Sequence, residues 1–264
     1  MRNINKFLLK FYHLENDIFF NQLFDTGEAL ITFNDTVTSP IWNHAFPYNL
    51  EKRKGEDRLL PYKEFIRNTV SFFVSKGRNP TIYLDEKYFS SPLLNLLFEN
   101  KFERFDNEAW MRLKKIKKRA IHRKDLKMAK VDDESKLPDF KRVLNECFSS
   151  EYAIELSRDF GKEFGFKRIE HFCFYDEMNQ LVGIGSVYYD KNTAHLHSVG
   201  VLPEKQRQGY GTVIVKEMYE YITKKLKIKD IVLQSDGMTV ELFYKQLGAE
   251  TFYRRYGYML TIEK

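Results

Sequence analysis

Apolar and polar positions follow two different periods along the second half of the 264-residue chain. Apolar residues three and four positions apart predict helices over residues 135–148 and from 212 to about 225, with further helices over 152–164 and 239–247. Short apolar or alternating runs predict strands at 128–131, 171–175, 181–189, 193–201, 231–234 and 252–262. The second half therefore predicts an α/β (α+β) domain with the order β-α-α-β-β-β-α-β-α-β.

The first half ends with a similar series of elements. An apolar strand at 82–84 corresponds to the one at 231–233, and a helix around 96–98 corresponds to the one around 242–244. In this alignment Phe98, which has no hydroxyl, stands opposite Tyr244. We predict two tandem copies of one fold, with a first domain over 1–113, a basic linker over 114–125 and a second domain over 126–264.

Positive charge is concentrated between residues 112 and 130, which hold ten Lys and Arg residues and one acidic residue. The rest of the chain has 33 basic and 36 acidic residues, although the whole chain carries +6. Such a stretch indicates either a nucleic-acid patch or a solvated linker. Because no nucleic-acid-binding motif accompanies it, we favour the linker and do not expect nucleic acid as a partner.

The two cysteines, Cys147 and Cys173, are too few for a disulfide framework or a CxxC metal site, and we expect no metal. Their apolar surroundings favour buried, inert thiols. No apolar run reaches the ~18 residues of a membrane span, and acidic residues soon follow the short apolar stretch at the N-terminus, unlike a signal peptide. We therefore expect a cytoplasmic protein without a membrane partner.

The segment from Val199 to Thr212 runs from a strand through a turn into the start of a helix. Gly209 and Gly211 let the backbone approach a ligand closely, and amide N–H groups at a helix start can bind one anion. Arg207 adds a charged donor. The segment predicts a phosphate or pyrophosphate site; the alternative from glycine spacing alone is a turn that packs the helix on its sheet.

Two segments of this half resemble signatures of the GNAT superfamily of acetyl-coenzyme-A-dependent N-acetyltransferases. Residues 206–211, QRQGYG, are similar to its R/Q-x-x-G-x-G/A signature, and residues 241–252, ELFYKQLGAETF, are similar to its A-x-x-L-Y-x-K-x-G-F segment. The resemblance covers roughly residues 126–264, and the first half resembles the family only in outline, as a degenerate copy. It implies a mixed, mostly antiparallel twisted sheet flanked by helices, and acetyl-CoA as co-substrate.

The resemblance also implies roles for individual residues. The backbone of Val199, Gly200 and Val201 would bind the acetyl carbonyl and the pantetheine arm. Tyr244 would protonate the departing coenzyme A thiolate, a contribution of ~10²–10⁴-fold; the alternative is an aromatic core residue. The pyrophosphate would be held by the turn and the helix start, at Gln206, Arg207, Gln208, Gly209, Tyr210, Gly211 and Thr212.

A general base must take a proton from the amine, and His197 is our candidate. Its unperturbed pKa of about 6.5 suits that role, and many family members carry a glutamate near this point. His195, two residues earlier on the same strand, should face the same side. The alternatives are that both are ordinary strand or pocket residues and that ordered water relays the proton.

Departures from the family pattern concern the contacts to the cofactor. Gly237 stands where the family often has an asparagine, and Val240 stands where it has an alanine. Ser235 or Asp236 would replace the contact of that asparagine through a shifted turn. Residues 231–234 also lack the acidic residue that the family carries on this strand.

Together these features predict an N-acetyltransferase, an acyltransferase that moves an acetyl group from acetyl-CoA to a primary amine by direct attack in a ternary complex. The acceptor is a small-molecule or peptide amine, and the oligomeric state stays open. The alternative is a non-catalytic acyl-CoA-binding sensor on the same fold, which Gly237 favours and Tyr244 opposes. The aromatic loop around Trp42 and His44 would either line the substrate cleft or be a packed loop.

Overall fold

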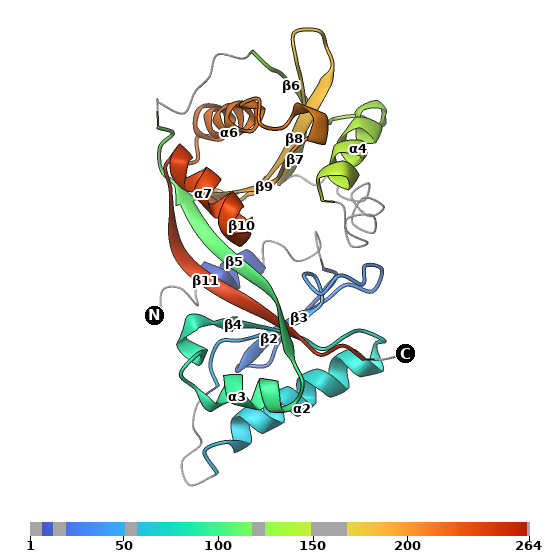
Figure 1. Cartoon of the computed structure of the whole chain (residues 1–264), viewed down its shortest axis with the longest axis vertical. Helices are drawn as coiled ribbons and strands as arrows, with labels where there is room; N and C mark the ends of the chain where they lie inside the picture. The colour runs from blue at the N-terminus through green and yellow to red at the C-terminus, as the bar shows by residue number, and fades with distance from the viewer. Residues whose placement is uncertain (1–6, 13–19, 51–56, 118–124, 149–167, 263–264) are drawn as a thin grey trace. The chain divides into compact units, whose positions relative to one another are not determined.

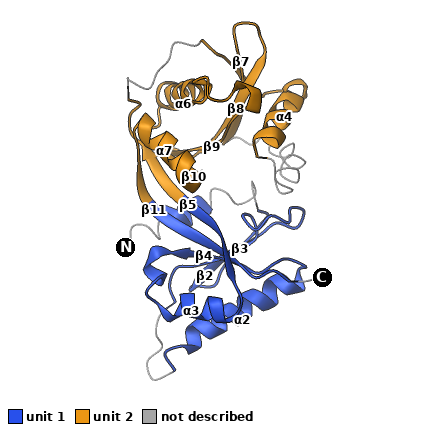
Figure 2. Cartoon of the chain, viewed as in Figure 1, with its two compact units in different colours: residues 1–108, 253–264 blue, residues 109–252 orange. Residues whose placement is uncertain are grey.

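The computed structural model describes residues 7–12, 20–50, 57–117, 125–148 and 168–262. The chain forms two compact units (Figure 2). Unit 1 consists of residues 1–108 and 253–264, and unit 2 consists of residues 109–252. These units differ from the predicted division, because the end of the last strand belongs to unit 1 and residues 109–113 belong to unit 2.

Unit 1 contains a sheet with the strand order β1-β2-β3-β4-β11-β5 (Figure 1). Strand β11 runs antiparallel to β4, from the pair Arg255–Asp85 to the pair Met259–Thr81. Helices α2 (Leu60–Ser75) and α3 (Pro92–Glu99) contribute their apolar residues to one core with this sheet. The strands are β1 (Gln22–Asp25), β2 (Ala29–Phe33), β3 (His44–Pro47), β4 (Thr81–Asp85), β5 (Glu103–Leu113) and β11 (Ala249–Met259).

A buried polar network lies inside unit 1. The Arg255 guanidinium donates to Glu108 from Nε (2.5 Å) and Nη2 (3.2 Å), and from Nη1 to the Tyr12 hydroxyl (2.6 Å). Tyr12 is also hydrogen-bonded to Nε2 of His44, at 2.8 Å. His44 and the neighbouring Trp42 are buried, so within unit 1 the aromatic loop is a packed element.

Unit 2 contains a mixed sheet with the strand order β5-β10-β9-β8-β7-β6, to which β11 contributes its first residues. The neighbouring strands β9 and β10 are parallel, whereas β6, β7, β8 and β9 pair antiparallel in turn. This arrangement confirms the predicted mixed, mostly antiparallel sheet. The strands are β6 (Lys127–Lys130), β7 (Ile169–Tyr175), β8 (Leu181–Tyr189), β9 (Thr193–Val201) and β10 (Asp230–Asp236).

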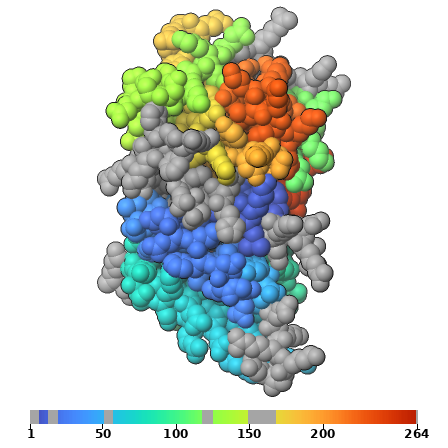
Figure 3. All heavy atoms as spheres, turned by 180° about the vertical axis from the view of Figure 1, so that it is seen from behind, coloured from blue at the N-terminus to red at the C-terminus, as the bar shows by residue number. Residues whose placement is uncertain are grey.

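Helices cover both faces of the unit 2 sheet. Helix α4 (Leu137–Cys147) contacts β7, β8 and β9, and it lies at the surface in Figure 3, in yellow-green. Helix α6 (Tyr210–Glu220) packs on the opposite face, continues as a π-helix over Tyr221–Lys225, and is followed after β10 by α7 (Gly237–Leu247). The predicted helix at 152–164 lies outside the described residues.

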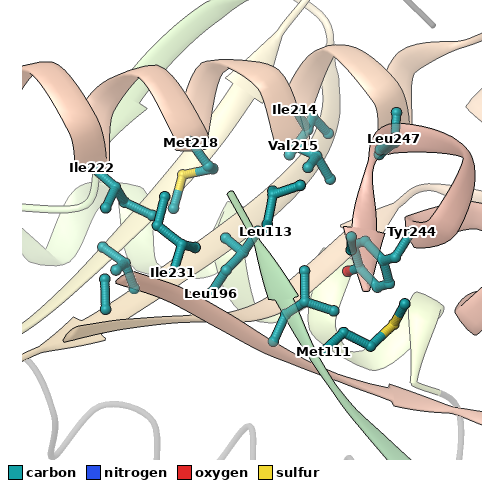
Figure 4. Packing of buried hydrophobic residues seen from close by; sticks show 14 of the residues in the cluster. Met111, Leu113, Leu196, Ile214, Val215, Met218, Ile222, Ile231, Tyr244 and Leu247 are labelled. Carbon is teal, nitrogen blue, oxygen red and sulfur yellow. The ribbon is translucent and has the colours of Figure 1, made fainter. Parts of the chain in front are cut away.

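The core of unit 2 forms where α6 and α7 meet the sheet (Figure 4). Ile214 and Met218 of α6, and Ile222 of the π-helix that continues it, project towards Leu196 and Ile231 of the sheet, and all five are buried. Their spacing of three to four residues is the apolar stripe that the sequence predicts for this helix. This packing fixes the N-terminus of α6 beside the end of β9.

The first part of the predicted linker is packed against unit 2. The Lys117 N–H donates to the carbonyl of Leu247 (3.0 Å), and the Tyr219 hydroxyl donates to the carbonyl of Lys114 (2.9 Å). Ile116 lies against the core. Residues 114–117 are therefore part of the domain, while 118–124 lie outside the described residues. Within the described ranges, the helices are all too short or too polar to cross a membrane.

Candidate functional site

Strand β9 separates from β10 before it ends. The parallel pairing runs from Thr193–Asp230 to Leu196–Leu233, while β9 continues to Val201. Against β8, residues Ser198 and Val199 together face the single residue Gly185, and Ser198 has φ +48°. An extra residue of this kind is a β-bulge, which bends its strand. The bulge accounts for the separation, which turns the backbone of Val199–Val201 away from the parallel pairing.

The turn before α6 has the geometry of an anion site. Arg207 and Gly209 both have positive φ, +57° and +87°, and Gly209 is the N-terminal cap of α6. The first helical N–H groups have no acceptor within the helix, and they carry the positive end of its dipole. In a turn where residues of positive and negative φ alternate, successive backbone N–H groups point into one concavity. Among the described residues Arg207 makes no ion pair, so its guanidinium is available there.

The anion turn and the end of β9 are in contact. A Cβ placed on Gly211 would lie 3.7 Å from the Val201 side chain and 3.4 Å from the Phe243 ring. Lys205, just before the turn, donates to Asp176 (3.0 Å) and Gln180 (2.8 Å) in the β7–β8 hairpin. The structure therefore brings together the strand and the turn that the sequence assigns to one ligand.

Tyr244 projects from α7 into the unit 2 core (Figure 4). The residue is 6% exposed, and its ring lies 5.1 Å from that of Phe243. Burial raises the pKa of its hydroxyl above the ordinary value of about 10. The phenol therefore holds its proton throughout the neutral range.

His197 lies on the other face of the sheet. Its Nδ1 is hydrogen-bonded to Oγ of Ser198 (2.6 Å), and its ring centroid lies 5.7 Å from that of His195. This proximity confirms that the two histidines face the same side. Burial, and secondly the nearby His171, lower the pKa of His197 to about 4. The imidazole is therefore neutral at pH 7, and the lowered pKa makes it a weaker base than an ordinary histidine.

The residues considered as replacements for the family asparagine differ in exposure. Ser235 is buried and its hydroxyl donates to the carbonyl of Ala109 at 3.5 Å, whereas Asp236 is exposed and precedes the first residue of α7, Gly237. Gly237 has φ +74°. The backbone at the start of α7 thus has a conformation that suits glycine, which asparagine also tolerates more readily than most residues.

One contact at this site was missed by the sequence prediction. Cys147, interpreted as inert, donates from Sγ to the carbonyl of Val201 at 3.0 Å. Gln206 donates from Nε2 to the same carbonyl, also at 3.0 Å. Cys147 and Val201 are 54 residues apart, so no local pattern indicates this contact.

Comparison with known proteins assigns unit 2 to a family. Residues 137–258 match the model of the Acetyltransferase (GNAT) family. Residues 137–258 form a GNAT domain. A curated relative, the uncharacterised N-acetyltransferase CgeE of Bacillus subtilis (strain 168), is 33% identical over 88 residues. That match covers 31% of this chain and 33% of the relative, so the chain spans about a third of that protein's length.

Solved structures resemble more of the chain than the GNAT domain alone. A functionally unknown conserved protein from Staphylococcus epidermidis has a TM-score of 0.68 at 18% identity, over 93% of this chain and 96% of that one. A GCN5-related N-acetyltransferase from Kribbella flavida has a TM-score of 0.66 at 13% identity, over 95% and 93%. A tandem GNAT protein from the clavulanic acid biosynthesis pathway has a TM-score of 0.58 at 13% identity, over 89% and 79%. These similarities concern the fold.

Proposed function

We propose that the GNAT domain transfers an acetyl group from acetyl-CoA to a primary amine, by direct attack in a ternary complex. The observation that carries this proposal is that Gln206 and Gly211, which flank the anion turn at Arg207–Gly209, both lie against Val201 at the separated end of β9. A pyrophosphate fits the turn, and an extended amide-containing arm fits a strand end whose backbone is not paired with β10. One ligand that combines both groups with a thioester is acetyl-CoA.

In this proposal, the main chain provides most of the binding. The N–H groups from Gln208 to Thr212 and the Arg207 guanidinium hold the pyrophosphate, and the backbone of Val199–Val201 holds the acetyl carbonyl and the pantetheine arm. Main-chain donors in a rigid turn are already oriented, so they lose little entropy when the ligand binds. Peptide groups of the bulge that point at the thioester oxygen would stabilise the negative charge that develops there.

Two side chains would move protons. The neutral amine attacks the thioester carbonyl carbon with its lone pair and forms the new C–N bond, and His197 takes the extra proton that the nitrogen then carries. The C–S bond breaks, and the sulfur takes a proton from the Tyr244 hydroxyl, which solvent restores. Support for the acid is the protonated state of Tyr244. The base is neutral at pH 7, but its pKa of about 4 makes it a weak proton acceptor, so its support is its position on β9 next to Val199–Val201. A positioned acid or base contributes ~10²–10⁴-fold.

The alternative is a non-catalytic acyl-CoA sensor on the same fold. Its support is the glycine at position 237 and the lack of an acidic residue over 231–234. We also propose that unit 1 is a degenerate copy of the fold. Support for this is its series β4–α3–β5, which repeats the order β10–α7–β11.

Release of free thiol from acetyl-CoA, measured with a panel of small-molecule and peptide amines, tests the proposal. Thiol release that depends on one class of amine is the expected result. Tight binding of acetyl-CoA without turnover of any amine would favour the sensor instead. Failure of coenzyme A to bind would overturn both.

A further inference from the structure

The carbonyl of Val201 points to the side of β9 that faces away from β8. The Leu202 N–H donates to the carbonyl of Val182 on β8 (2.9 Å), and successive residues of a strand direct their polar groups to opposite edges. Val201, one residue earlier, therefore directs its N–H and C=O away from β8. This is the side on which the pairing with β10 has already ended.

Two side chains of the protein donate hydrogen bonds to the Val201 carbonyl. Cys147 donates from Sγ and Gln206 donates from Nε2, each at 3.0 Å. A carbonyl oxygen has two lone pairs, so both acceptor positions of Val201 are in use. An incoming ligand that donates to this oxygen must displace one of the two side chains.

The two donors differ in how firmly they are held. Cys147 is partly buried at the end of α4, and a Cβ on Gly200 would lie only 3.1 Å from both its Cβ and its Sγ. Gln206 is exposed and lies in the turn before α6. Its carboxamide is attached through a flexible stem and is free to rotate into solvent. Gln206 is therefore the donor that can leave.

The displaced carboxamide of Gln206 is chemically similar to the part of the ligand that would replace it. We propose that the carboxamide of Gln206 occupies, in the free protein, the position of an amide N–H of the pantetheine arm, and that it is displaced when acetyl-CoA or coenzyme A binds. Both groups are neutral amide N–H donors to the same carbonyl. This inference rests on the proposed function, because it assumes that the pantetheine arm follows β9.

Coenzyme A must break the hydrogen bond from Gln206 to the Val201 carbonyl before it binds. Its affinity is therefore lowered by the net free energy of that hydrogen bond. An exposed neutral hydrogen bond corresponds to about two- to tenfold in a binding constant. The side chain of Gln206, which the family resemblance places among the residues that hold the pyrophosphate, thus weakens binding of the cofactor, while the backbone of the turn that follows it strengthens binding. Substitution by a side chain that cannot donate should make binding tighter.

The test compares Gln206→Met with Gln180→Met, by calorimetric titration with coenzyme A alone. Methionine keeps the length of the side chain and cannot donate a hydrogen bond. Gln180 is a matched control, because it is also exposed and its carboxamide accepts from Lys205 (2.8 Å) rather than donating to β9. We expect Gln206→Met to have a Kd about two- to tenfold below both the wild-type protein and Gln180→Met.

A second readout follows the side chain directly. In the wild-type protein, the ¹⁵N-labelled carboxamide of Gln206, assigned by its loss in Gln206→Met, should move to the chemical shifts of a solvated amide when coenzyme A is added. Weaker binding by Gln206→Met, or a Gln206 signal that coenzyme A leaves unchanged, would overturn the inference while the proposed function stands. If the wild-type protein does not bind coenzyme A, it is the proposed function that fails.

Discussion

The series β4–α3–β5 of unit 1 and β10–α7–β11 of unit 2 have the same order and differ in the residue that each helix buries. Each helix is followed by a residue with positive φ, Gly248 (+108°) directly after α7 and Lys101 (+62°) two residues after the end of α3, and each of these N–H groups donates to a carbonyl three residues earlier. Alignment on these two residues places Leu97, not Phe98, opposite Tyr244. Leu97 is fully buried, whereas Phe98 is 53% exposed. This alignment differs by one residue from the one that the sequence suggests.

This comparison separates what the fold needs from what the chemistry needs. Both helices need a large buried residue four positions before the left-handed one, and Leu97 and Tyr244 both meet that need. Only the tyrosine has a hydroxyl that can donate a proton. A single side chain at a shared structural position thus distinguishes a helix that only packs from one that we propose takes part in catalysis.

Removal of that hydroxyl should have the largest effect. We expect Tyr244→Phe to lower kcat about 10²- to 10⁴-fold, because the thiolate would leave without its acid, while the ring keeps the core packed. The measurement is steady-state thiol release. Tyr175→Phe is the control, since it removes a hydroxyl that donates to Asp139 in the same domain, and its kcat should stay within about twofold. Full activity of Tyr244→Phe would show that the Tyr244 hydroxyl has no catalytic role and that α7, like α3, only packs.

Loss of the buried cation should destabilise unit 1. Arg255→Met leaves the Glu108 carboxylate buried without its partner, and we expect unit 1 to lose about 3–5 kcal/mol of its free energy of unfolding. Hydrogen exchange of the α2 and β4 amides measures the effect in this unit. The double variant Glu108→Leu with Arg255→Met should recover most of the loss. If the double variant were as unstable as Arg255→Met, the loss in the free energy of unfolding would come from altered packing rather than from an unpaired charge.

The two helix ends should respond in opposite directions. Gly248→Ala introduces a Cβ at 2.5 Å from the carbonyl of Lys115 and at a φ that disfavours alanine, so we expect a loss of about 2 kcal/mol in the free energy of unfolding. Lys101→Gly relieves the same strain in unit 1 and should gain about 1 kcal/mol. Thermal or urea unfolding measures both. Equal effects of the same sign would refute the structural alignment of the two helices.

Acid should weaken unit 2 through its buried histidines. Burial lowers the pKa of His171 to about 4, so between about pH 4 and 6.5 the unfolded chain binds a proton that the folded chain does not. Stability should therefore fall as the pH drops through this range, by at most about 1.4 kcal/mol per pH unit for this histidine. His171→Gln should flatten the decrease in the unfolding midpoint between pH 6.5 and 4.5. An unchanged pH dependence would contradict the assignment.

Local sequence patterns were sufficient for most of the described elements of unit 2 and for the glycine turn before α6. The apolar stripe of α6 and the glycines at 209 and 211 are signals within a few residues of one another, and the structure has the helix and its cap there. Tyr244 was found in the same way, because it follows a short motif on one helix. These features depend on backbone conformation and helical periodicity, which neighbouring residues determine.

Contacts between distant residues could not be found in this way. The donation from Cys147 to Val201 joins positions 54 apart, and the positive φ of Ser198 depends on how β9 pairs with β8. The assignment of residues 253–264 to unit 1 is of the same kind, because which strand these residues join depends on long-range pairing.

The pairing of β11 with β4 has a consequence for how the chain is made. Residues 255–259 complete the hydrogen bonds of β4, and Arg255 reaches Tyr12, 243 positions earlier. A ribosome therefore synthesises the whole of unit 2 before it adds the strand that unit 1 requires. Until then, the carboxylate of Glu108 has no guanidinium partner and one edge of β4 has no strand beside it. Unit 1 can therefore complete its sheet only after unit 2, which follows most of it in the chain, has been synthesised.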